Sequence, residues 1–317
     1  MGFDAENLLM SNVSNYQGDL VIVDALKNPL TTYLGVRDEI EGTNFEEVGS
    51  MLFNMSQAHT LDAPSQPAVT ENQTIAAIAS GVNKGVQVTN ALQVFTAAVN
   101  ASPIKLANKT ISGNAIDGEA LLLQVFAPQI KFHREQIKAN YEFSVWNGVF
   151  SDGSANSDTA FQIRGILNAA DIASVDALNL PVTVDLINEV LQKMADGGAD
   201  FEDVQLHCRS DLKIAVGKLY ALAPRDRTLG GVNITRIETD FGEVSLVWNP
   251  KIPADTIGFV DAANCKLVSN TVPGGVPFGM YGIASVSMAQ KRQLYGHLGI
   301  DYKHGCKHGK LIKVKAK

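Results

Sequence analysis

The 317-residue sequence predicts an α+β fold with a long helix, a long β-hairpin and a compact region of alternating helices and strands. Three patterns support this prediction. Apolar residues recur at helical spacing over 118–149, an alternation typical of a strand runs through 85–100, and short helical and strand patterns alternate after residue 181. No segment repeats along the chain, so we expect no repeat architecture.

Residues 1–42 have weak periodicity, with turn signals at Asn28-Pro29 and at Gly35. We therefore predict an N-terminal arm that contains at most a short helix. An isolated arm cannot offset the entropy lost on ordering, so it is stable only when it lies on another surface.

The next segment, 43–101, predicts an extended β-hairpin loop. Residues 43–56 form the outgoing strand, and 85–100 form the returning strand. The segment 57–83 between them is rich in turn-forming residues and predicts a long loop. Because a two-stranded ribbon is marginal in water, we expect it to pack against a neighbouring subunit.

The helix predicted over 118–149 has the strongest signal in the chain. Pro128 interrupts the pattern and predicts a kink or a restart, and Gly148 begins the end of the helix. The apolar stripe consists of Leu122, Phe126, Ile130, Ile137, Tyr141 and Val145.

After residue 181 a helix is predicted up to Gly197-Gly198, then a strand over 204–208, then a helix that Ser210 and Asp211 can cap. Later strands are predicted at 244–248, 257–259, 280–288, 294–302 and 310–315.

Charge argues against a dedicated nucleic-acid binder, because the net charge is −7 and charged residues make up only 19% of the chain. The segment from Lys303 to Lys317 differs, since it contains six Lys and no acidic residue. It is either a solvated strand end or a basic tail that touches nucleic acid.

Three cysteines, with no CxxC pair, argue against a disulfide framework. The N-terminus lacks the features of a secretory signal, and no apolar stretch reaches the roughly 18 residues of a membrane span. We expect no membrane association.

No motif for phosphate binding, dinucleotide binding or nucleophilic catalysis is present, and we expect neither an enzyme nor a cofactor. One constellation leaves an alternative open. His304, Cys306 and His308 would share one face of a strand, and their side chains are potential zinc or copper ligands. The simpler interpretation is a polar strand end, and the other is a metal-dependent enzyme.

The order of these elements resembles the major capsid proteins of tailed bacteriophages, the Hong Kong 97-type shell subunits. The resemblance extends to short motifs, among them a T-D-F-G strand and a closing K-H-G-K-like strand. The segments that carry it are DALKNPLTTYLGV (24–36), TNFEEVGSML (43–52), VQVTNALQVFTAAVNAS (86–102), GEALLLQVFAPQIKFHREQIKANYEFSVWNG (118–148), ETDFGEVSLVWNPKIPADTIGFVD (238–261) and YGHLGIDYKHGCKHGKL (295–311).

The resemblance implies an N-terminal arm at 1–42, an extended loop at 43–101, an axial domain at 181–271, and a peripheral domain at 102–180 and 272–317 with a spine helix at 118–149. It also implies a structural subunit of pentamers and hexamers, assembled in the host cytoplasm into an icosahedral virion shell around double-stranded DNA. Separate scaffolding, portal and decoration proteins are possible partners. A bacterial nanocompartment shell of the same fold is the alternative.

Arg225, Asp226 and Arg227 form a charged loop within the expected axial domain. We hypothesise that they lie near the capsomer axis and pair with charges of the next subunit. The alternative is a solvated surface loop.

Overall fold

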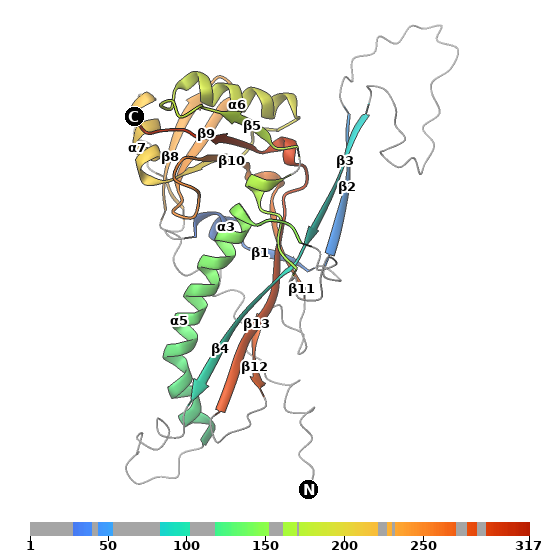
Figure 1. Cartoon of the computed structure of the whole chain (residues 1–317), viewed down its shortest axis with the longest axis vertical. Helices are drawn as coiled ribbons and strands as arrows, with labels where there is room; N and C mark the ends of the chain where they lie inside the picture. The colour runs from blue at the N-terminus through green and yellow to red at the C-terminus, as the bar shows by residue number, and fades with distance from the viewer. Residues whose placement is uncertain are drawn as a thin grey trace, which may run out of the picture. The chain divides into compact units, whose positions relative to one another are not determined.

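The computed structural model confirms a mixed α+β architecture (Figure 1). One compact unit comprises residues 46–89, and the other comprises the rest of the chain. The structure describes residues 28–39, 44–52, 83–101, 118–151, 161–169, 171–220, 227–229, 232–270, 278–283 and 290–317.

The smaller unit contains most of a two-stranded sheet, formed by β2 (Asn44–Leu52) and β3 (Asn83–Ala91). These strands confirm the predicted hairpin arms. The expected loop at 43–101 is too long, however, because β4 (Gln93–Ala101) pairs with a strand of the larger unit instead. Alternation along the chain identifies a strand but not its partner, so the two strands on either side of Leu92 looked like one.

The first sheet of the larger unit has five strands and is built around its longest member, β13 (Gln290–Asp301). β13 pairs antiparallel with three strands, and β1 pairs parallel with one of those three. The remaining strands are β1 (Val36–Glu39), β11 (Lys266–Asn270), β12 (Phe278–Ile283) and β4.

The helix α5 (Gly118–Asn147) packs on this sheet (Figure 1). The described part of the predicted stripe is buried: Ile130, Ile137, Tyr141 and Val145. Tyr141 meets the ring of Phe95 edge-on at 5.3 Å and donates a hydrogen bond to the Gly299 carbonyl at 2.8 Å.

Pro128 does not restart α5, which is one continuous helix through that position. Pro128 is exposed, so a backbone carbonyl left without an amide donor on that side can be hydrated instead.

The second sheet has seven strands in the order β5-β14-β10-β6-β9-β8-β7. The β5–β14 and β6–β9 pairs are parallel, and the other pairs are antiparallel. The strands are β5 (Ala173–Asp176), β6 (Val204–Cys208), β7 (Arg227–Leu229), β8 (Val232–Thr239), β9 (Gly242–Trp248), β10 (Ile257–Asp261) and β14 (Gly309–Ile312).

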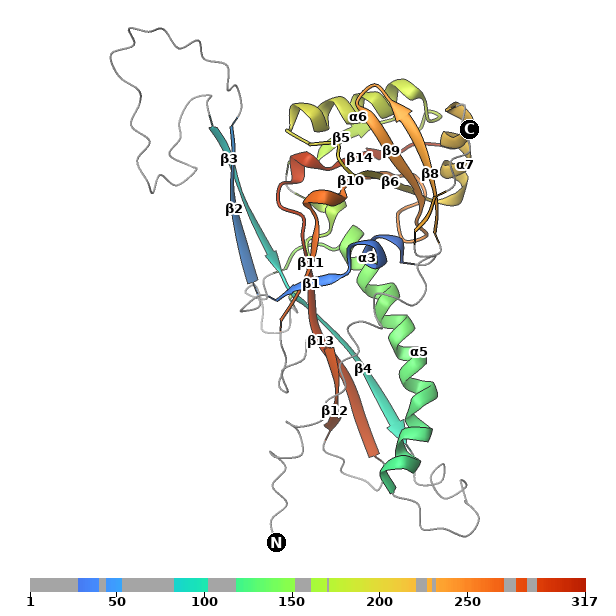
Figure 2. The same ribbon diagram turned by 180° about the vertical axis from the view of Figure 1, so that it is seen from behind.

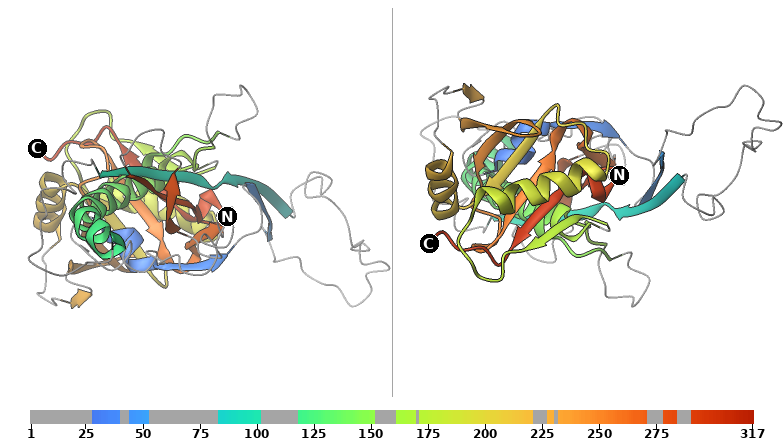
Figure 3. Two further views of the ribbon diagram at one scale, coloured as in Figure 1. Left: turned by 90° about the horizontal axis from the view of Figure 1, so that it is seen from below. Right: turned by 90° about the horizontal axis from the view of Figure 1, so that it is seen from above.

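Two helices, α6 (Val184–Asp196) and α7 (Ser210–Leu219), cover one face of this sheet (Figures 2 and 3). They bury Ile187, Val190, Leu212 and Val216 in a single apolar cluster with the strands. The Thr183 side chain caps α6 by accepting from the Leu186 amide at 3.3 Å. The expected cap of α7 is wrong, because the N-cap is Arg209 and its side chain makes no capping bond.

The sheet also crosses the expected domain boundaries. β5 belongs to the segment 102–180 and β14 to 272–317, yet both lie in the sheet formed by 204–261. Conversely, β11 falls within 181–271 but pairs in the five-stranded sheet. Long-range strand pairing decides these assignments, and local periodicity does not contain that information.

The predicted arm also ends inside the larger unit. The short helix α3 (Pro29–Leu34) and β1 both belong to it, and β1 pairs with β11. Residues 1–27 lie outside the described residues.

Candidate functional site

Three segments that are distant in the sequence meet at the C-terminal half of α5: the start of α3, α5 itself, and residues 248–251 after β9. We call this meeting point the junction. It joins the helix of the five-stranded sheet to the seven-stranded sheet and holds the start of α3.

Glu142 is the centre of the junction and is fully buried. Its Oε1 accepts from the Leu30 amide at 3.3 Å, Trp146 Nε1 at 3.1 Å and Asn249 Nδ2 at 2.8 Å. Its Oε2 accepts from the Thr31 amide at 2.9 Å. Two of these donors are amides in the first turn of α3, which have no partner inside the helix.

Burial raises the pKa of Glu142, because the charged form loses its hydration. The hydrogen bonds donated by Thr31, Asn249 and Leu30 oppose this effect, since they favour the carboxylate. A buried carboxylate is tolerated only when its oxygens are satisfied in this way, and each of the four donors depends on the same side chain.

Trp146, one turn beyond Glu142, contacts the face of the seven-stranded sheet opposite α6. Its ring lies 4.8 Å from that of the buried His207. A Cβ at Gly258 would stand 2.5 Å from the Trp146 ring, so this strand position must be glycine for the ring to fit. Burial lowers the pKa of His207 to about 3, so the imidazole is neutral in the fold.

Asn90, near the end of β3, belongs to the larger unit and is buried there. Its Oδ1 accepts from the Ala91 and Arg164 amides at 2.9 and 2.7 Å. Its Nδ2 donates to the carbonyls of Arg164 and Ile300 at 3.2 and 3.0 Å. One amide side chain therefore anchors the end of this strand to two other backbone segments.

The potential metal ligands do not share one face of a strand. Residues 305–307 form a 3-10 turn, which breaks the alternation between His304 and His308. Both ring nitrogens of His308 are used: Nδ1 accepts from the Asp261 amide at 3.2 Å, and Nε2 donates to the Tyr302 carbonyl at 2.8 Å. Among the described residues, no group of three His, Cys, Asp or Glu side chains is arranged to hold a metal.

Three of the six lysines of the C-terminal segment 303–317 have partners within the fold. Lys307 and Lys313 form ion pairs with Asp200 and Asp176 at 2.9 and 2.6 Å, and Lys310 donates to the Leu167 carbonyl at 2.8 Å. These contacts favour the interpretation of this segment as a strand end rather than a free basic tail.

The charged loop lies mostly outside the part of the chain that the structure describes. Arg225 and Asp226 lie outside the described residues, and Arg227 begins β7 with its side chain outside them. Glu142, Asn249 and Asn90, by contrast, were not predicted. The sequence did contain a signal for Glu142, because this acidic residue lies among Tyr141, Val145 and Trp146 on the apolar side of the helix. A carboxylate buried there needs hydrogen-bond donors.

Solved structures with the same fold are shell proteins. The capsid of cyanophage A-1(L) is similar with a TM-score of 0.59 and 11% identity, covering 98% of this chain and 99% of that one. The holo-SrpI encapsulin complex of Synechococcus elongatus PCC 7942 is similar with a TM-score of 0.58 and 12% identity, covering 100% of this chain and 96% of that one. The structure of Mycobacterium phage Patience is similar with a TM-score of 0.53 and 10% identity, covering 95% of this chain and 86% of that one. No curated protein sequence matches.

The fold therefore defines the class: the chain has the Hong Kong 97-type fold of viral capsid subunits. Its sequence matches the SU10 major capsid protein family over residues 3–315, and the chain belongs to that family. It is a structural protein of a tailed-phage capsid. In the described residues, no helix is both long and apolar enough to cross a membrane.

Proposed function

We propose that copies of this chain assemble, without catalysing a reaction, into pentamers and hexamers of a closed icosahedral shell around double-stranded DNA. The match to a major capsid family over nearly the whole chain carries the proposal. Assembly would take place in the host cytoplasm, with separate scaffolding, portal or decoration proteins as possible partners.

The two-stranded sheet of β2 and β3 gives this proposal a physical basis. Most of it forms a separate compact unit of the chain, and a lone ribbon of this length is marginal in water. Neighbouring copies would supply the missing surface. Several weak contacts per subunit then add to a stable shell, because closure makes each further contact intramolecular.

Electron microscopy and light scattering of the purified chain test the proposal. We expect closed shells, or rings of five and six subunits, that package DNA when produced during phage infection. A matched variant replaces residues 46–89 with a short Gly-Ser linker and should fold but fail to assemble. A chain that stays monomeric with its phage partners present would contradict the proposal.

The charged loop has its own place in this proposal. Arg225, Asp226 and Arg227 would line the capsomer axis and pair with the next subunit. The double variant Arg225→Glu/Arg227→Glu should then reduce ring formation, and the further change Asp226→Arg should partly restore it. Normal rings in the double variant would remove the loop from the axis.

A nanocompartment shell is the second candidate, and the similarity to the SrpI encapsulin complex favours it. The contents of the particles distinguish the two functions. Particles that contain a single cargo enzyme and no DNA would support the nanocompartment, whereas DNA-filled particles would support the phage head.

A further inference from the structure

One turn of the seven-stranded region places two large apolar side chains in solvent. Leu178 is 71% exposed and Leu180 is 57% exposed, and Asn179 and Pro181 are exposed as well. A single exposed leucine is ordinary on a protein surface, but a run of exposed residues that contains two leucines is an apolar projection. We call residues 178–181 the leucine tip.

The backbone of the leucine tip is unusual for a leucine. The Leu180 amide donates to the Ala177 carbonyl at 2.8 Å, and the two residues between them, Leu178 and Asn179, have φ 53° and 64°. Positive φ at both central positions defines a type I′ turn, in which glycine and asparagine are favoured. Asn179 suits its position, whereas Leu178 is strained because its Cβ crowds the backbone.

Hydrogen bonds hold the leucine tip in this strained conformation. The Asp176 carboxylate accepts from the Leu178 amide at 2.9 Å, and the Lys313 carbonyl accepts from the Asn179 amide at 2.8 Å. Because the backbone is fixed, a partner that binds the leucines orders little of the tip. Strain that the surrounding structure imposes on an exposed residue is typical of a binding site.

Lysines of the C-terminal segment border the leucine tip. The Lys315 amide donates to the Leu180 carbonyl at 3.0 Å, so this segment runs alongside the tip. The Lys313 ammonium is paired with Asp176. Lys315 and Lys317 are exposed, and neither has an acidic partner among the described residues. The surface beside the leucines therefore carries unpaired positive charge, although the whole chain has a net charge of −7.

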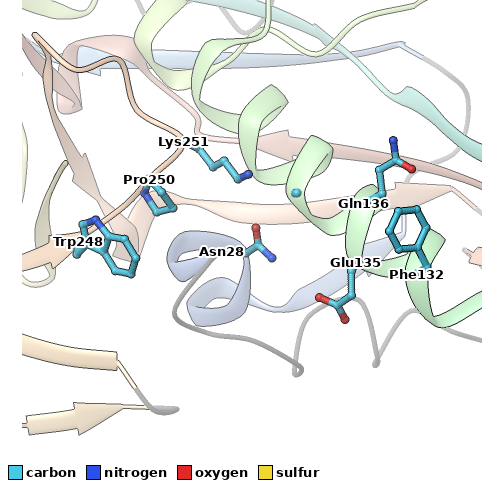
Figure 4. A pocket seen from close by; sticks show the side chains of 8 residues that line it. Asn28, Phe132, Glu135, Gln136, Trp248, Pro250 and Lys251 are labelled. Carbon is cyan, nitrogen blue, oxygen red and sulfur yellow. The ribbon is translucent and has the colours of Figure 1, made fainter. Parts of the chain in front are cut away.

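The leucine tip projects, so its partner must supply the hollow that the leucines enter. The cleft of about 480 Å³ at the junction lies between α5 and residues 248–251, and no residue of the tip lines it (Figure 4). Acidic side chains at the rim of a partner's hollow would complement Lys315 and Lys317. A nucleic acid would use the lysines but leave the leucines in water, so a protein is the better occupant.

We propose that the leucine tip docks a separate protein whose surface has an apolar hollow edged by acidic side chains. The proposal rests on the shell function above and names the kind of accessory protein that would bind the shell. One tip buries far less than the roughly 1,200–2,000 Å² of a stable pairwise interface, so a single contact is weak. A shell repeats the tip in a regular array, and a partner that contacts several tips at once gains avidity.

Photo-crosslinking in particles purified from infected cells tests this inference. Leu180 is replaced by p-benzoylphenylalanine, itself apolar, in the full-length chain, and the particles are irradiated at low and at high salt. We expect a covalent adduct with one protein other than this chain, and a lower yield at high salt because ions screen the lysines. Adducts only between copies of this chain, or no adduct, would overturn the inference.

Substitutions in the same background show whether the tip itself makes the contact. Leu178→Gly removes one leucine and relieves the strained backbone, so it keeps the fold, and it should lower the adduct yield about tenfold. Lys315→Glu/Lys317→Glu should lower the yield to a similar extent. Ile214→Ala, at a similarly exposed apolar residue on α7, is the matched control and should leave the yield unchanged.

The outcomes separate this inference from the proposed function. An adduct yield that neither the leucine nor the lysine change alters would overturn the inference alone. The absence of particles from the unmodified chain would overturn both it and the proposed function.

Discussion

The two larger sheets differ in how completely the chain covers its own apolar surface. The seven-stranded sheet buries one face under α6 and α7, and Trp146 covers part of the other. Of the described helices, α5 and the short α3 pack on the five-stranded sheet, and α5 turns Phe132 and Phe143 outward. The first region completes its core by itself, whereas the second leaves surface that other chains can cover.

Sequence patterns of the two main helices reflect this difference. In α6, the apolar residues Ile187, Val190, Leu191 and Met194 are all buried, and none of its large apolar residues is strongly exposed. In α5, a buried stripe coexists with two exposed phenylalanines. A helix that is apolar on a second face is typical of an element that contacts partners on both sides.

The largest expected effect comes from separating the two regions at Glu142. Glu142→Ala removes the acceptor of four buried donors and should lower the free energy of unfolding by about 3–5 kcal/mol. Hydrogen exchange should show faster exchange of the Leu30 and Thr31 amides, while the β6 and β10 amides remain protected.

Glu142→Gln is the matched control for this change. It keeps the volume and one acceptor oxygen but places an NH₂ group opposite the Thr31 amide, so we expect roughly half the loss of stability. If Glu142→Ala leaves exchange at Leu30 and Thr31 unchanged, the carboxylate does not hold α3, and the junction has been assigned wrongly.

A smaller effect is expected from pH at the same contact. Because the pKa of His207 falls from 6.5 to about 3 on folding, its contribution to stability is complete above pH 6.5. It is lost as pH falls from 6.5 towards 3, at up to ~1.4 kcal/mol per pH unit. His207→Phe keeps a ring against Trp146 but cannot titrate.

Chemical denaturation between about pH 4 and pH 7 measures this difference. The free energy of unfolding of His207→Phe should fall less steeply with decreasing pH, because its unfolding takes up to one proton fewer. The slope that remains includes His308, whose pKa is also lowered by burial. If the free energy of unfolding of the two proteins depends equally on pH, burial between α5 and the sheet does not lower the pKa of His207.

Prediction from sequence succeeded where structure is local. The strand at Val204–Cys208 was predicted at its observed bounds, and the helix α7 was predicted with its start misplaced by the wrong cap. Apolar alternation and helical spacing are contained in a few consecutive residues, so both elements could be found from sequence. The stripe on α5 was also predicted, and its described residues are buried.

Prediction failed where the answer depends on residues far apart in the chain. β14 joins β5 across more than 130 residues, and Asn249 reaches Glu142 across 107. The His304 constellation failed for a different reason. Gly305 and the residues after it form a turn, and a spacing argument that assumes a strand then no longer applies.

The smallest expected effect lies in the seven-stranded region and has the opposite sign. Leu178, in the turn after β5, has φ 53° and a 71% exposed side chain. A leucine in this left-handed conformation is strained, and glycine adopts the conformation freely. Leu178→Gly should therefore raise the free energy of unfolding by about 0.5–1 kcal/mol.

Leu180→Gly is its control, because Leu180 is similarly exposed but has no positive φ. This second change should be neutral or slightly destabilising, since glycine only adds entropy to the unfolded chain there. Thermal unfolding of both variants compares them directly. If Leu178→Gly is destabilising instead, the exposed leucine packs against something in the free subunit, and the seven-stranded region is then less complete by itself than its buried core indicates.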